Sequence, residues 1–235
     1  MKKLFKILAY IALWVLVISV IAVCIYERHD RTARDANISA YTHVADNFYV
    51  DSNCNDEAVS VMNEFVDILP TVFVEEFRDD WVVIIEDKIE PPASWPSNVV
   101  IDAYTHWQSR VIILRNQTDS NKMLNTFVHE IGHCFDFEYG SVSYSDVFHE
   151  IYSLYQLNFL EQDPYAAPGY ATSSPVEFFA TCFKEYLLYP EHLKTAAPKA
   201  YTFIDLFYNN VLELKRGYYY NFDAVVNTLR RITEG

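Results

Sequence analysis

The chain has 235 residues, of which 51% are hydrophobic, and this is enough for one domain with a sizeable core. Its formal net charge is −14, and basic residues gather at the N-terminus. Residues 35–235 therefore carry 12 Lys and Arg against 30 Asp and Glu, a net charge of −18. Because nucleic acid and anionic lipid surfaces repel such a charge, we expect no nucleic-acid partner.

A run without charged side chains extends from Ile7 to Tyr26, soon after three lysines. A helix that crosses a bilayer needs about 20 apolar residues. A cleaved signal peptide usually has an apolar region of only about 7 to 15 residues and a small-residue cleavage site, which this chain lacks. We predict a cytoplasmic stub and an uncleaved transmembrane anchor over residues 1–26, with the domain outside the cytoplasm at a bacterial cell surface.

Residues 27–50 are polar and weakly patterned, which predicts a juxtamembrane linker before a domain over residues 51–235. Apolar residues at three- to four-residue spacing predict a helix over residues 56–69. Pro70 ends it, and a short second helix is expected over residues 72–77.

Short β-branched runs predict strands over residues 81–85 and 110–115. Helical spacing returns in the segment around His133 and in four later segments: residues 144–160, 175–189, 198–214 and 222–232. The expected fold is therefore α+β and predominantly helical, with a small mixed sheet ahead of the helices.

Three cysteines lie outside the apolar N-terminal run: Cys54, Cys134 and Cys182. So few do not form a disulfide framework, and we expect free buried thiols. A Cys134–Cys182 disulfide stays open as an alternative.

An H-E-x-x-H motif stands at residues 129–133. Residues four apart share one helix face, so the imidazoles of His129 and His133 point the same way, as a tetrahedral Zn²⁺ requires. Glu130 lies beside them, where a carboxylate activates water as a general base. The motif indicates metal-assisted hydrolysis of a peptide bond, and it needs a third ligand.

The third ligand is not fixed by local chemistry. The extended metzincin motif is excluded because Asp136 and Tyr139 occupy its Gly and last His positions. A Glu from further along the chain is the alternative, and the candidates are Glu138, Glu150, Glu161, Glu177 and Glu185. Glu177 has suitable neighbours, but it is also position N3 of a capping box that begins at Ser174. Its carboxylate either binds the metal or caps the N-terminus of a helix.

Two segments resemble the catalytic domain of anthrax lethal factor and the related bacterial Pro-Pro endopeptidases. They are H-E-I-G-H-C-F-D at residues 129–136 and P-V-E-F-F-A at residues 175–180, with Tyr170 seven residues before Glu177. The resemblance implies a zincin-like fold and a gluzincin-type zinc metallopeptidase.

The resemblance also implies roles for single residues. The positions that match the ligands of one Zn²⁺ are His129, His133 and Glu177. Glu130 matches the general base, and Tyr170 matches a residue that stabilises the transition state. Thr181 departs from the family, whose members often have an acidic residue at this position.

The predicted function is that of a membrane-anchored zinc endopeptidase that acts on protein or peptide substrates. The alternative is a non-catalytic or regulatory zinc-binding module of the same fold. Whether the substrate contains Pro-Pro bonds or another sequence stays open.

Two further expectations concern the surroundings of the site. Asp136 lies on the ligand face of its helix, where a carboxylate often holds a ligand imidazole by its second N–H. An extended substrate adds naturally to a sheet edge, and residues 110–114 are expected to be that edge. Three nearby residues either wall the cleft or only pack: Tyr104, His106 and Trp107.

Overall fold

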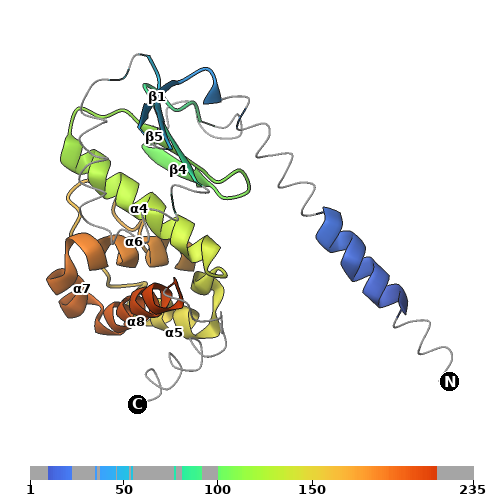
Figure 1. The fold of residues 1–235 in the computed structure, drawn as a ribbon. Coiled ribbons are helices and arrows are strands. Elements are labelled where there is room, and N and C mark those ends of the chain that lie inside the picture. Colours follow the sequence, from blue (N-terminus) through green and yellow to red (C-terminus); the bar gives the residue numbers. More distant parts are fainter. Residues whose placement is uncertain are drawn as a thin grey trace, which may run out of the picture.

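The structure is a computed structural model, shown in Figure 1. It describes residues 10–22, 38–45, 47–52, 81–91 and 100–215, together with residues 35, 54 and 77. The helices predicted over residues 56–69 and 222–232 lie outside this part of the chain, and nearly all of the one predicted over residues 72–77 does as well.

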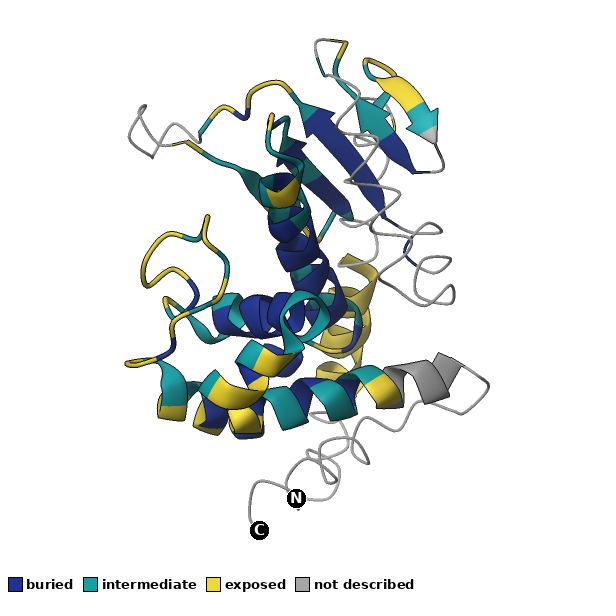
Figure 2. Ribbon diagram, turned by 90° about the vertical axis from the view of Figure 1, so that its left-hand side faces the viewer, coloured by how far each residue is buried: buried dark blue, intermediate teal, exposed yellow. Residues whose placement is uncertain are grey.

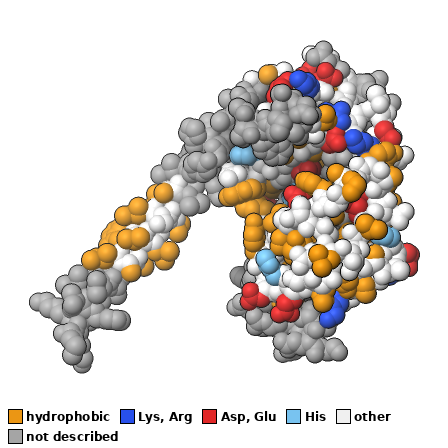
Figure 3. All heavy atoms as spheres, turned by 180° about the vertical axis from the view of Figure 1, so that it is seen from behind, with side chains coloured by type: hydrophobic (Ala, Val, Ile, Leu, Met, Phe, Trp, Pro, Cys, Tyr) orange, Lys and Arg blue, Asp and Glu red, His pale blue; other side chains and the backbone are white. Residues whose placement is uncertain are grey.

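Residues 10–22 form a helix with exposed side chains. Apolar groups cover the face of this helix seen in Figure 3. The exposed apolar side chains of the helix include Leu13, Trp14 and Leu16. Both ends of the predicted transmembrane segment lie outside the described residues. Within those residues, no helix has both the length and the apolar character that crossing a membrane requires.

Five strands form one mixed sheet in the order β1-β2-β3-β5-β4. Their bounds are β1 Thr42–Ala45, β2 Phe48–Val50, β3 Val82–Glu86, β4 Ala103–His106 and β5 Val111–Arg115. The three inner strands are parallel, and β1 and β4 pair antiparallel at the two edges. The predictions of β3 and β5 are confirmed, since a strand inside a parallel sheet reads as a continuous apolar run.

Two expectations about the sheet are corrected. Residues 42–45 and 48–50 form β1 and β2, so they belong to the sheet of the folded domain and not to a linker. The predicted edge, residues 110–114, lies inside the sheet, because β5 pairs with β3 on one side and β4 on the other. The edge beside the helices is β4, whose short A-Y-T-H sequence lacks a β-branched run.

The helices follow the sheet in the chain, as predicted. Their bounds are α4 Ser120–Glu138, the 3₁₀ helix η1 Val142–Tyr144, α5 Asp146–Tyr155, α6 Pro175–Leu188, α7 Pro190–Ala196 and α8 Pro198–Lys215. The helix predicted over residues 144–160 is shorter than expected, since α5 ends at Tyr155. Residues 156–174 form a long loop instead.

Helix α4 lies between the sheet and the other helices (Figure 1). It contacts β4 and β5 on one side and α6 on the other. Buried residues gather where these layers meet (Figure 2). Aromatic side chains fill the core, and the almost fully buried phenylalanines of the described residues are Phe127, Phe148, Phe178, Phe179, Phe183 and Phe203. Each contributes roughly 1.5–3 kcal/mol through burial.

The α+β prediction of a helix-rich domain with a small mixed sheet is confirmed. The thiols of Cys54, Cys134 and Cys182 are free, and the last two are buried, which rules out the Cys134–Cys182 alternative in this structure.

Candidate metal centre

The site depends on a close approach of α4 and α6. A Cβ atom at Gly132 would lie 2.8 Å from the Cα of Ala180 and 3.0 Å from its carbonyl oxygen. No real side chain tolerates such contacts with a backbone. Glycine at residue 132 therefore lets the two helices approach closely enough for their side chains to meet.

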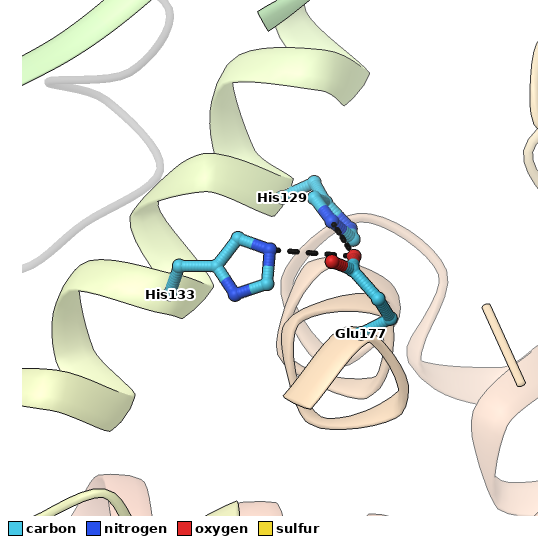
Figure 4. A group of neighbouring side chains, drawn as sticks. All are labelled: His129, His133 and Glu177. Atoms are coloured by element: carbon cyan, nitrogen blue, oxygen red, sulfur yellow. Dashed lines mark hydrogen bonds and ion pairs between the residues drawn. The ribbon is translucent and has the colours of Figure 1, made fainter. Parts of the chain in front are cut away.

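Helix α4 supplies two imidazoles. Asp119 caps the helix by accepting a hydrogen bond from the backbone N–H of Lys122 at 3.1 Å, which satisfies one of the free N–H groups of the first turn. His129 and His133 lie one turn apart, and their rings are 4.8 Å apart and nearly perpendicular. Both side chains point at α6 (Figure 4).

Helix α6 supplies a carboxylate. Ser174 caps it by accepting from the backbone N–H of Glu177 at 3.2 Å, and Pro175 starts the first turn. Glu177 thus takes part in capping through its backbone. Its side chain turns toward the two imidazoles instead, so the capping and ligand alternatives are compatible.

The three groups converge on one point. Glu177 Oε2 lies 3.1 Å from His129 Nε2 and 3.4 Å from His133 Nε2. Candidate ligand atoms of all three residues lie within 4.8 Å of one another. Two ligands bound tetrahedrally to Zn²⁺ at its usual bond lengths are about 3.4 Å apart, so the donor set fits a zinc ion.

The charges at the site are strongly coupled. Burial alone raises the pKa of Glu177, but hydrogen bonds to both imidazoles outweigh it and hold this pKa well below its usual range. Burial lowers the pKa of His133, yet the carboxylates of Glu177, Glu130 and Asp136 outweigh that effect and raise it. The carboxylate of Glu177 is therefore ionised at neutral pH and available as a ligand.

Glu130 is 7% exposed and points toward the edge of the sheet. The hydroxyl of Thr105, on β4, donates a hydrogen bond to Glu130 Oε2 at 2.6 Å. Nothing in the local sequence indicates this contact, because the two residues are 25 positions apart on different elements.

Tyr170 lies next to His129. Its ring is 6.1 Å from the ring of His129, and half of its surface is exposed. Partial burial and the negative charges of Glu177 and Glu130 raise the pKa of its hydroxyl well above the usual value. The phenol stays protonated at neutral pH and can donate a hydrogen bond.

The loop that carries Tyr170, residues 156–174, is tied to α6 by buried charges. Lys184 is 2% exposed, and its Nζ lies 2.8 Å from carboxylate oxygens of both Glu161 and Asp163. The neighbouring Glu185 accepts from the backbone N–H of Gln162 at 2.5 Å. The same helix thus positions Glu177 and holds this loop in place.

Two residues next to the ligands take roles that differ from expectation. Asp136 does not hold an imidazole. Its two oxygens accept from the N–H and hydroxyl of Ser143, at 2.7 and 2.5 Å, and so fix the turn after α4. Thr181 contacts a ligand instead, with Oγ1 3.4 Å from His129 Nδ1. The spacing of four residues from Glu177 puts Thr181 on the same helix face, a signal available in the sequence.

The other glutamates considered as ligands are engaged elsewhere or exposed. Glu138 pairs with Arg110 at 2.7 Å and accepts from the indole of Trp81. Glu185 lies 2.5 Å from His192 Nδ1, and Glu150 is exposed on α5. Glu177 is the glutamate that the structure brings to the histidines.

The helix-rich α+β fold with two histidines and a glutamate at its centre places the chain in the metallopeptidase class. The family model described as anthrax toxin lethal factor, N- and C-terminal domain, matches residues 88–207. This is just over half of the chain, so the chain belongs to that family, and the resemblance noted from its motifs is confirmed.

A solved structure shares the fold. The Pro-Pro endopeptidase PPEP-2 from Paenibacillus alvei superposes with a TM-score of 0.52 and 18% sequence identity. The match covers 68% of this chain and 96% of that one. No curated protein matches the sequence.

Proposed function

We propose that the chain is a zinc-dependent endopeptidase. The observation that carries this proposal is the convergence of His129, His133 and Glu177 from two helices, at the spacing of a tetrahedral zinc site. Membership of the lethal factor family supports it. Zinc held by these three residues would lower the pKa of a bound water to about 7 and polarise the scissile carbonyl.

The chain's own residues then move the protons and stabilise the charge. Glu130 takes a proton from the attacking water and passes it to the leaving amine. Tyr170, protonated at neutral pH, donates a hydrogen bond to the oxyanion that forms on the substrate carbonyl. The half-exposed position of Tyr170 suits contact with an incoming substrate.

An extended peptide substrate would pair with β4. Among the residues that the structure describes, this strand is at the edge of the sheet, with β5 paired on one side of it. Backbone groups on a free edge accept an added strand, which gives a peptide its register. Trp107 is 45% exposed and lies just beyond the end of β4, with its ring centroid 4.8 Å from that of Phe137 and the two ring planes tilted by 35°. It provides an apolar surface for substrate side chains.

We also propose that residues 7–26 anchor the protein in a membrane, with the catalytic domain outside the cytoplasm. Support comes from the uncharged run in the sequence and from the exposed apolar side chains of the helix over residues 10–22. Protease accessibility of the domain in intact cells tests this arrangement, since a cytoplasmic domain would be protected.

The proposed activity is tested with the full chain in detergent micelles and a peptide library that includes Pro-Pro sequences. Wild type, Glu130→Gln and Glu150→Gln are compared with and without a zinc chelator. Glu150→Gln is the matched control, because this glutamate is exposed on α5. We expect cleavage by wild type and the control, and its loss with Glu130→Gln or chelator. Zinc binding without any cleavage that depends on Glu130 would instead support a regulatory zinc-binding module.

A further inference from the structure

The general base has a partner on the sheet that the chemistry described so far does not use. Thr105 lies in the middle of β4, paired with Ile112 of β5. Its hydroxyl is 2.6 Å from Glu130 Oε2 and 3.4 Å from the carbonyl oxygen of the same residue. The residues on either side of it, Tyr104 and His106, are exposed. Successive side chains of a strand point to opposite faces of the sheet, so the side chain of Thr105 lies on the face that meets α4.

We propose that Thr105 is a positioning residue for the general base and links it to the strand that receives the substrate. The proposal rests on the endopeptidase function. Thr105 holds one carboxylate oxygen of Glu130 by a hydrogen bond, and the second oxygen would accept the proton of the attacking water.

The physical reason lies in the freedom of a glutamate side chain. Glu130 has three rotatable side-chain bonds, and a base must lie within hydrogen-bond reach of the proton that it abstracts. A hydrogen bond to an ionised acceptor is both short and strong, and Thr105 is itself held by the ladder between β4 and β5. The contact therefore fixes the carboxylate against a rigid element.

The position of Thr105 on the edge strand gives the contact a second consequence. A peptide that pairs with β4 would lie against the backbone that carries Thr105. The same strand then sets both the register of the substrate and the orientation of the base. The substrate and the base are therefore aligned by one rigid element and not through a connecting loop. Misplacement of a reacting group by about 1 Å can cost about 100-fold in rate.

Thr105→Val removes the hydroxyl and keeps the shape and β-branching of the side chain. Zinc content should stay unchanged, since Thr105 makes its hydrogen bond to Glu130 and the ligands are other residues. We expect kcat to fall by about 10- to 100-fold with KM nearly unchanged. Thr105→Ser keeps the donor and should restore most of the activity. Thr42→Val is the matched control, an exposed threonine on β1 at the opposite edge of the sheet.

A measurement without substrate separates this inference from the proposed function. The change in Tm caused by Thr105→Val is compared in the wild-type and Glu130→Ala backgrounds. A larger loss in the wild-type background shows the coupling between the two side chains. Coupling together with the fall in kcat and rescue by serine supports the inference. Unchanged kcat in an active protein, loss of zinc, or equal Tm changes in both backgrounds overturns it. If the wild-type protein binds zinc and shows the coupling but cleaves no peptide, the proposed function is overturned. The catalytic role of Thr105 is then overturned as well.

Discussion

Because α4 and α6 approach closely at Gly132, we predict that Gly132→Ala weakens zinc binding strongly while the protein still folds. The added Cβ would lie 2.8 Å from Ala180 Cα, whereas contacts below 3.4 Å are already tight. The helices must separate by about 0.6 Å to relieve it. Ligand distances in a metal site tolerate only about 0.2 Å, so Glu177 can no longer complete the site made by the histidines.

The effect on folding should be smaller. Overpacking costs about 1–3 kcal/mol, while replacing a helical glycine by alanine returns about 1 kcal/mol of helix propensity. We expect the free energy of unfolding of the zinc-free protein to fall by only about 0–2 kcal/mol. The zinc dissociation constant should rise by at least about 10-fold.

Competition with a fluorescent zinc chelator measures the affinity, and urea unfolding in chelator measures the stability. Asn121→Ala is the control, because it introduces an alanine at an exposed position in the first turn of the same helix. If Gly132→Ala binds zinc as tightly as wild type, the close approach does not set the geometry of the site.

Three further predictions concern the surroundings of the site. Thr181→Val should weaken zinc binding by about 10- to 100-fold while Thr181→Ser retains it, because the hydroxyl orients the ring of His129; chelator competition decides. Tyr170→Phe should lower kcat by about 100- to 1000-fold and leave zinc content unchanged, and an equal kcat would remove Tyr170 from the mechanism. Lys184→Met should destabilise the protein by about 3–5 kcal/mol in urea unfolding, because it leaves two buried carboxylates without their cation; a change below 1 kcal/mol would contradict this.

The parts of the fold that were predictable share a strong local pattern. The apolar runs of β3 and β5 and the helical spacing of α4 and α6 are read directly from neighbouring residues. β4 was missed because an edge strand of four residues depends on its neighbours for stability more than on its own propensity.

The same distinction holds at the site. His129, Glu130 and His133 are adjacent in one motif, so the sequence alone indicates them. The role of Glu177 stayed open because its backbone serves the helix cap and its side chain faces the histidines, two uses of one residue that no pattern separates. Thr105 gave no signal, since its contact with the base exists only after the sheet and α4 have packed.

The central claim is that His129, His133 and Glu177 bind one zinc ion. Anomalous diffraction at the zinc absorption edge, on crystals of the protein prepared with zinc, tests this most directly. We predict a single strong peak about 2.0–2.2 Å from His129 Nε2, His133 Nε2 and a carboxylate oxygen of Glu177. A peak elsewhere, or none at these three residues when zinc is present in excess, would contradict the claim.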